Sequence, residues 1–124
     1  MNFSYILIGL GGALGAILRV TLGNIVPLTI FNIPFHILFI NILGCFLMGI
    51  ISELLTYWPS SLNFKYFLIS GLLGGFTTFS SFALEFGLLI EKNQISIAFL
   101  YLVLSFSLSL IFFFIGMKLV KLII

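Results

Sequence analysis

The stretch GGFTTFSSF, from Gly74 to Phe82, decides how the third apolar block of this chain folds. The block around it is apolar enough to cross a membrane, yet its centre holds two adjacent glycines followed by Thr77 and Thr78. Glycine adds backbone entropy, and threonine hydroxyls compete for backbone hydrogen bonds, so we expect the helix to break here. Irregular backbone survives at membrane depth only where it is buried in protein or lines a cavity, and its carbonyls can then coordinate a cation.

Composition places the chain in a lipid bilayer. Of its 124 residues, 62% are hydrophobic and 6% are charged, far from the balance of a water-soluble domain. A membrane-spanning helix needs about 20 apolar residues, so this length allows four spans. Turn-like segments separate four apolar blocks, at about residues 3–22, 35–57, 65–90 and 95–117. We expect a single all-α integral membrane domain over residues 1–124, with its third helix broken at the centre.

The same composition excludes several functional classes. The net charge of +2 and the scattered lysines do not suit nucleic-acid binding. With one histidine, His36, and one cysteine, Cys45, the sequence offers neither a cluster of metal ligands nor an intramolecular disulfide. No serine or cysteine has the histidine and carboxylate partners of a nucleophilic enzyme. We therefore expect a membrane protein that is not an enzyme.

The placement of lysine and arginine gives the chain almost no preferred orientation. Alternating spans put Lys65, Lys118 and Lys121 on the side of the N-terminus, and Arg19 and Lys92 on the other side. This weak bias permits insertion in both directions, and a mixed population can form antiparallel homodimers. The alternative is that the bias still orients every copy. Because four short helices enclose little interior, we expect any ion path to lie between subunits.

Small and charged residues mark one face of the first helix. Gly11 and Gly15 form a GxxxG pair, whose simplest role is close packing of helix backbones in lipid. Arg19 lies one turn further along that face, and a charge at the centre of a span costs at least about 2.5 kcal/mol. Arg19 either extends to the water interface or has a structural or electrostatic role in attracting an anion.

The second helix carries Asn41 among apolar neighbours. An asparagine in hydrocarbon needs hydrogen-bond partners, so we expect it to point into the bundle. It either joins helices or donates an amide N–H to an anion in transit. Glu53, near the end of this helix, is expected to be solvated at the interface.

Phe79 and Phe82 share a face of the half-helix that follows the expected break, and Glu85 continues that face. A phenyl ring has a positive edge, so ring edges around a path can favour a small dehydrated anion without a fixed charge. Phenylalanine is also an ordinary packing residue in a chain that has 16 of them. The spacing alone leaves both roles open.

The fourth helix carries a stripe of hydroxyl groups. Tyr101, Ser105 and Ser109 follow at intervals of four residues and form a drifting row about 12 Å long. Such a row can solvate an ion stepwise, or its hydroxyls can bond back to their own helix.

Three signatures together give the chain a family resemblance. They are GGALGAILR at 11–19, NILGCFLMG at 41–49 and GLLGGFTTFSSFALE at 71–85, of which the third is highly specific. With them, the sequence resembles the CrcB/Fluc family of fluoride channels over nearly its whole length. The resemblance implies an antiparallel, dual-topology homodimer in the plasma membrane, the inner membrane of a prokaryote. It also implies two fluoride pores along the subunit interface and passive export that lowers cytoplasmic fluoride.

The resemblance assigns pore roles to individual residues. Asn41 matches the pore asparagine, and Phe79 and Phe82 match the phenylalanines whose ring edges contact fluoride. The hydroxyl positions of the pore are matched by Ser81, Tyr101, Ser105 and Ser109.

Further matches lie at the centre and the entrance of the family's pore. Gly74 and Thr77 match positions whose backbone carbonyls, from both subunits, hold a structural Na⁺. Arg19 matches the arginine of the vestibule, and Glu85 matches the acidic residue that follows the phenylalanine motif.

The chain departs from the family pattern at two places. Family members often carry Gly-Thr where this chain has His36 and Ile37, which removes a hydroxyl from that end of the pore. Ser81 stands where threonine is common and keeps the hydroxyl.

Two other classes match the size of the chain. A small dual-topology multidrug antiporter shares the four spans and the weak charge bias, but it needs a carboxylate within the first helix, where this chain has Arg19. A non-transporting membrane scaffold would use the hydroxyl stripe to join helices and would carry no ion.

Overall fold

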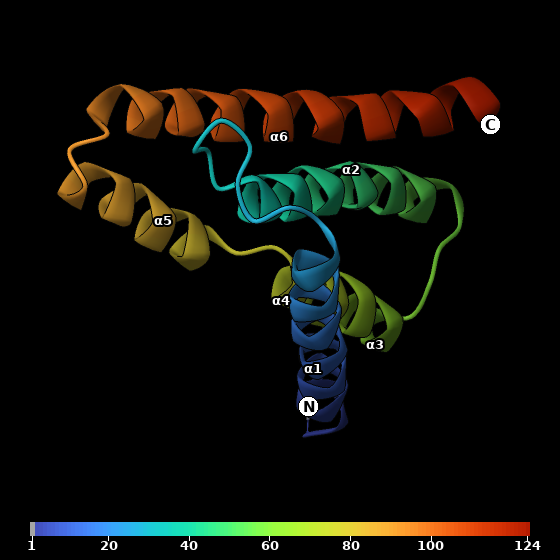
Figure 1. The fold of residues 1–124 in the computed structure, drawn as a ribbon. Helices are drawn as coiled ribbons and strands as arrows, with labels where there is room; N and C mark the ends of the chain where they lie inside the picture. Colours follow the sequence, from blue (N-terminus) through green and yellow to red (C-terminus); the bar gives the residue numbers. More distant parts are fainter. Residues whose placement is uncertain (1) are drawn as a thin grey trace.

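The computed structural model describes residues 2–124, which form helices joined by short loops (Figure 1). The long helices are α1 (Asn2–Ile25), α2 (Phe35–Tyr57) and α6 (Ile95–Ile123). Between α2 and α6 lie α3 (Leu62–Lys65), the π-helix η1 (Tyr66–Leu73), α4 (Gly74–Phe76) and α5 (Phe79–Glu91). Four segments are long and apolar enough to cross a membrane, and the third of them is the series from α3 to α5. The predicted all-helical membrane fold with four spans is confirmed.

The third span is interrupted by two extended residues, Thr77 and Thr78. Their backbone angles lie in the β region, with φ −87° and ψ 150° at Thr77 and φ −151° and ψ 125° at Thr78. The broken third helix is thus confirmed. Gly74, with φ −63° and ψ −36°, remains helical, so the break falls on the threonines and not on the glycines.

Helix ends differ from the sequence expectation in three spans. The helix α1 ends at Ile25 instead of near residue 22, because Pro27 is the first residue that cannot continue it. The helix α6 runs to Ile123 instead of residue 117 and includes Lys118 and Lys121, whose long side chains can reach the interface from within a helix. The third span begins three residues earlier than expected, with the short α3.

The helices form two packed groups, α2 with α6 and α1 with η1 and α4. In Figure 1, α2 and α6 lie side by side and run in the same direction. The helix α1 stands at a steep angle to them, beside α3 and α4, with its N-terminus at the far end. The helix α5 leads from the break to the start of α6. The break therefore lies between the two groups.

Glycines set the close approach of α1 to the third span. A Cβ atom at Gly11 would overlap the carbonyl oxygen of Phe67, and one at Gly15 would overlap that of Leu72. From the opposite side, a Cβ at Gly75 would lie 2.6 Å from the carbonyl oxygen of Gly12. The packing role predicted for the GxxxG pair is confirmed.

The apolar core joins α2, α5 and α6. Its buried members are Ile37, Leu38, Phe82, Leu89, Ala98 and Tyr101. Ile37 is thus a core residue, and its neighbour His36 donates from Nδ1 to the carbonyl oxygen of Leu28 at 2.9 Å. The two residues that depart from the family pattern therefore support the core and the loop between α1 and α2.

Glu53 is buried, so the expectation of a solvated side chain was wrong. It is 6% exposed. It lies four residues after Gly49, which packs against the backbone of α6 at Phe113, and residues four apart share a helix face. Glu53 is therefore on the packed face of α2, and proximity to the end of a helix does not by itself place a side chain in water.

Candidate functional site

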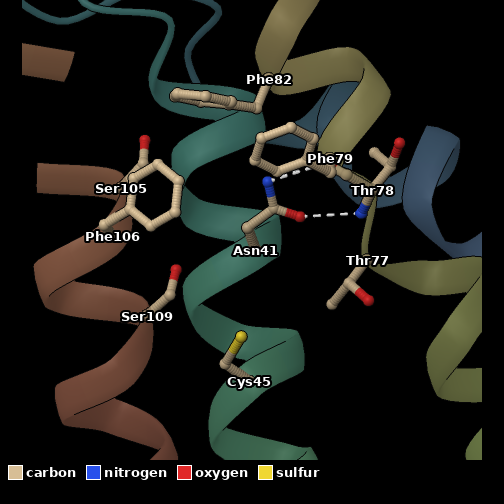
Figure 2. Close-up of a pocket in the computed structure, with 9 residues that line it drawn as sticks. All are labelled: Asn41, Cys45, Thr77, Thr78, Phe79, Phe82, Ser105, Phe106 and Ser109. Carbon is tan, nitrogen blue, oxygen red and sulfur yellow. Dashed lines mark hydrogen bonds between the residues drawn. The ribbon is translucent and has the colours of Figure 1, made fainter. Parts of the chain in front are cut away.

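A cavity of about 260 Å³ opens beside the break in the third span. Figure 2 shows its lining residues, which are Asn41, Cys45, Thr77, Thr78, Phe79, Phe82, Ser105, Phe106 and Ser109. They come from α2, the extended residues, α5 and α6, and none of them carries a charge. The irregular backbone of the third span thus lines a cavity. This is one of the few places where such backbone is tolerated within a membrane, because lipid cannot hydrogen-bond to it.

Asn41 joins α2 to the break through two hydrogen bonds, drawn as dashed lines in Figure 2. Its Nδ2 donates to the carbonyl oxygen of Thr78 at 3.0 Å, and its Oδ1 accepts from the Thr78 N–H at 2.9 Å. The side chain points into the bundle, as predicted. A carboxamide has two N–H donors, so one remains beyond the bond to Thr78.

These bonds leave one backbone carbonyl next to the break without a hydrogen-bond donor. The Thr78 N–H donates to Asn41 and not to the carbonyl of Gly74, four residues earlier, so that carbonyl lacks its usual helical partner. Gly74 is also exposed. The next carbonyl, of Gly75, accepts from Nε of Arg19 at 3.3 Å. Arg19 therefore has a structural partner at the break instead of extending freely to the interface.

Three phenyl rings cluster at one end of the cavity. Phe82 is 5% exposed and Phe79 is 67% exposed, and their ring centroids lie 5.4 Å apart. The ring of Phe106 meets both edge to face, at 5.8 Å from Phe82 and 6.1 Å from Phe79. The two phenylalanines of the motif are thus in the cavity, one packed and one largely open.

The hydroxyl stripe of α6 divides between the cavity and the core. Ser105 and Ser109 line the cavity. Tyr101 is fully buried with its ring centroid 5.0 Å from that of Phe82, and it is not a lining residue. Ser81 is also outside the lining, and its backbone N–H donates to Oγ1 of Thr78 at 3.3 Å. Of the four hydroxyl positions taken from the resemblance, two therefore reach the cavity.

The two residues assigned to the vestibule lie in different places. Arg19 bonds the break, whereas Glu85 lines a second cavity of about 140 Å³ together with Lys92 and Asn32. That cavity lies between the α1–α2 loop and the end of α5. Within one chain the structure does not bring Arg19 and Glu85 together.

Sequence reasoning missed three cavity residues, Cys45, Thr78 and Phe106. Cys45 follows Asn41 by one helical turn, which is the signal that places it on the same face of α2. Phe106 lies three residues before Ser109, and this spacing is the signal that places it on the same face of α6.

The cavity presents partial positive charge from neutral groups only. Its sources are the second N–H of Asn41, the serine hydroxyls, phenyl edges and the N-terminus of α5, whose cap residue Thr78 lies in the lining. Such groups can replace the water around a small anion without the strong attraction of a full charge.

Comparison with known proteins identifies relatives along nearly the whole chain. A family model described as "CrcB-like protein, Camphor Resistance (CrcB)" matches residues 6–117. A "Fluoride-specific ion channel FluC" from Campylobacter fetus subsp. fetus is 40% identical over 124 residues, covering 98% of this chain and 97% of the relative. Proteins with the same name are similar in Helicobacter pylori (38% over 124 residues; 98% and 95%) and in Rhodopseudomonas palustris (36% over 120 residues; 95% and 97%). The chain therefore belongs to the CrcB-like family.

Proposed function

We propose that this protein is a fluoride-selective channel that releases fluoride passively from the cell and so lowers its cytoplasmic concentration. The relatives named above are fluoride-specific ion channels, not enzymes. The observation that carries the proposal is the cavity itself, which lies at a broken membrane helix and has only neutral hydrogen-bond donors and phenyl rings in its lining.

The cavity lining suits a small anion that holds its water strongly. Fluoride is held by the second N–H of Asn41, by the hydroxyls of Ser105 and Ser109, and by the edges of Phe79 and Phe82. Conduction needs binding that is strong enough for entry and weak enough for exit. Neutral donors meet both conditions, whereas a fixed positive charge in the lining would retain the ion.

The functional unit in this proposal is an antiparallel homodimer with two pores along the subunit interface. Phe79 belongs to the lining but is 67% exposed in the single chain, so a second subunit is expected to complete the cavity wall. The nearly balanced placement of lysine and arginine supports the presence of both orientations in the membrane. Tyr101 and Ser81 then act behind the lining, by supporting Phe82 and the N-terminus of α5.

A structural Na⁺ between the two subunits is part of the same proposal. Gly74 is exposed, its carbonyl lacks a helical donor and Thr77 is extended. Both positions therefore have backbone oxygens of the kind that holds Na⁺ at broken membrane helices. When bound, Na⁺ would supply a fixed positive charge that holds the two breaks against each other. Glu85 would act nearer a pore entrance, whereas Arg19 would support the break through its bond to Gly75. The dimer would lie in the plasma membrane of the cell.

Ion efflux from liposomes tests the proposed function. Liposomes that contain the protein and are loaded with fluoride or chloride are expected to release fluoride only, with Na⁺ present on both sides. Equal release of chloride would overturn the assignment. Proton-coupled uptake of a cationic drug would instead identify an antiporter, and no flux of any kind would identify a scaffold.

A further inference from the structure

The loop between α1 and α2 folds into a tight hairpin. Ile30 and Ile33 exchange two backbone hydrogen bonds, of 3.0 and 2.9 Å. The two residues between them, Phe31 and Asn32, both have positive φ, of 53° and 65°, which is the pattern of a type I′ turn. Asparagine is common at such angles, whereas a bulky aromatic residue is an outlier. The hairpin therefore holds Phe31 in a strained conformation, and such residues cluster at sites that bind or clamp.

The hairpin exposes this aromatic ring at its tip. Phe31 is 89% exposed, so its ring makes almost no contact within the chain. On the inner side, Ile33 packs against the apolar core, and Asn32 lines the second cavity together with Leu88 of α5. The hairpin is thus fixed to the helices on one side and presents a phenyl ring on the other.

The position and composition of the loop favour lipid as the partner of this ring. The loop joins two membrane spans, so it lies at the boundary of the bilayer (Figure 1). No lysine, arginine, aspartate or glutamate occurs from residue 20 to residue 52, whereas the α5–α6 turn at the same end of the molecule follows Glu91 and includes Lys92. Leu28 and Ile30 are exposed beside Phe31. An exposed, uncharged apolar surface in this place is typical of a membrane contact.

The backbone of the loop is also suited to lipid, which cannot hydrogen-bond to unpaired N–H and C=O groups. Ile30 and Ile33 satisfy each other, and the Phe35 N–H donates to the carbonyl oxygen of Leu28 at 3.0 Å. The same oxygen accepts from Nδ1 of His36 at 2.9 Å. The two prolines of the loop have no N–H to satisfy. A loop surrounded by water would need none of these bonds.

We propose that the hairpin is a membrane anchor, in which the Phe31 ring inserts into the interfacial region of the bilayer and fixes the depth of the α1–α2 loop. The partner is a lipid surface, recognised by an uncharged aromatic tip. Interfacial segments bury their apolar face about 5–10 Å into the boundary between headgroups and acyl chains, and we expect the ring at that depth. The anchor does not depend on fluoride conduction, because Phe31 does not line the first cavity.

Tryptophan fluorescence in liposomes tests the position of the tip. Trp58 is the only tryptophan, so Trp58→Phe/Phe31→Trp carries a single indole at the tip. Lipid brominated near the headgroup should quench its emission more strongly than lipid brominated near the chain end, and acrylamide in the water should quench it weakly. Strong quenching by acrylamide would overturn the anchor. Quenching by neither agent would also overturn it and would place the tip against a second copy of the chain.

The matched control is Trp58→Phe/Glu91→Trp. Glu91 is exposed at the end of α5, beside the charged turn at the same end of the molecule. Its indole should be quenched strongly by acrylamide and weakly by either brominated lipid.

A further variant separates the Phe31 ring from the shape of the turn. Asparagine tolerates left-handed backbone, so Phe31→Asn should keep the hairpin and remove the aromatic ring. In Trp58→Phe/Ile30→Trp, the indole at position 30 reports the depth of the loop. Adding Phe31→Asn should shift its emission to longer wavelength and increase quenching by acrylamide. Unchanged emission and quenching would show that Phe31 does not hold the loop in the membrane.

Discussion

At the scale of single residues, Asn41 holds the third span in its broken form. Its side chain satisfies both the N–H and the carbonyl of Thr78, at 2.9 and 3.0 Å. In Asn41→Leu, a change of similar shape, both backbone groups lose their partner. Each unsatisfied buried group costs about 1–3 kcal/mol, so the free energy of unfolding should fall by about 2–6 kcal/mol. Chemical unfolding in detergent micelles measures this loss.

The matched control is Ser109→Ala. Ser109 lines the same cavity but takes no part in the bonds to Thr78, so this variant should lose much less stability than Asn41→Leu. If both variants unfold at the denaturant concentration of the wild-type protein, the break does not depend on Asn41.

Polar residues within apolar blocks were the ones for which the sequence carried a signal. Asn41, Ser105 and Ser109 are polar within apolar blocks, and all three lie in the cavity because polar groups in lipid must face protein or water. Cys45 and Phe106 were missed, since a thiol and a phenyl ring are ordinary in an apolar helix. Their spacing places them on the faces of α2 and α6 that carry Asn41 and Ser109, and the packing of α2 along α6 brings those faces together.

At the scale of elements, α1 packs against η1 and α4 through glycine. A Cβ at Gly15 would overlap the carbonyl oxygen of Leu72 and lie 2.8 Å from the backbone nitrogen of Phe76. Gly15→Ala should therefore lower the free energy of unfolding by about 1–3 kcal/mol, the usual cost of overpacking. Gly9, on the same helix, has nothing within 4 Å of the position that a Cβ would take, so Gly9→Ala should be neutral or stabilise by up to about 1 kcal/mol. Thermal unfolding, followed by circular dichroism, measures the stability of both variants. Equal changes in stability would show that α1 does not depend on a glycine at position 15 for its packing.

In the third span, the local sequence pattern predicts that the helix breaks but not at which residues. The sequence predicted a break, but its position on Thr77 and Thr78 depends on Asn41, which lies 37 residues away from Thr78 in the chain. Gly75 packs against Gly12 of α1, in a contact that a side chain would prevent. Both effects come from neighbouring helices, so no pattern within the span itself could predict them.

At the scale of the whole molecule, positive charge is nearly balanced between the two ends of the spans. Figure 1 shows the C-terminus and the α2–α3 loop at one end, and the α1–α2 loop and the α5–α6 turn at the other. Lys65, Lys118 and Lys121 belong to the first end, and Lys92 belongs to the second, together with Arg19 in the second half of α1. The proposed antiparallel dimer would need copies inserted in both directions, so charge substitutions that remove this balance test the proposal.

Two variants with opposite charge bias provide that test. Leu28→Lys/Ile95→Lys adds charge at the end that holds Lys92, and Ile123→Lys/Ile124→Lys adds charge at the C-terminal end; all four positions are exposed. Because lysine placement sets orientation, each variant alone should insert in one direction and show fluoride efflux reduced by about tenfold or more, and co-expression of the two should restore it. Glutamine at the same four positions controls for the lost apolar side chains. Full efflux from one variant alone, with its single orientation verified by labelling from one side, would show that antiparallel pairing is not needed.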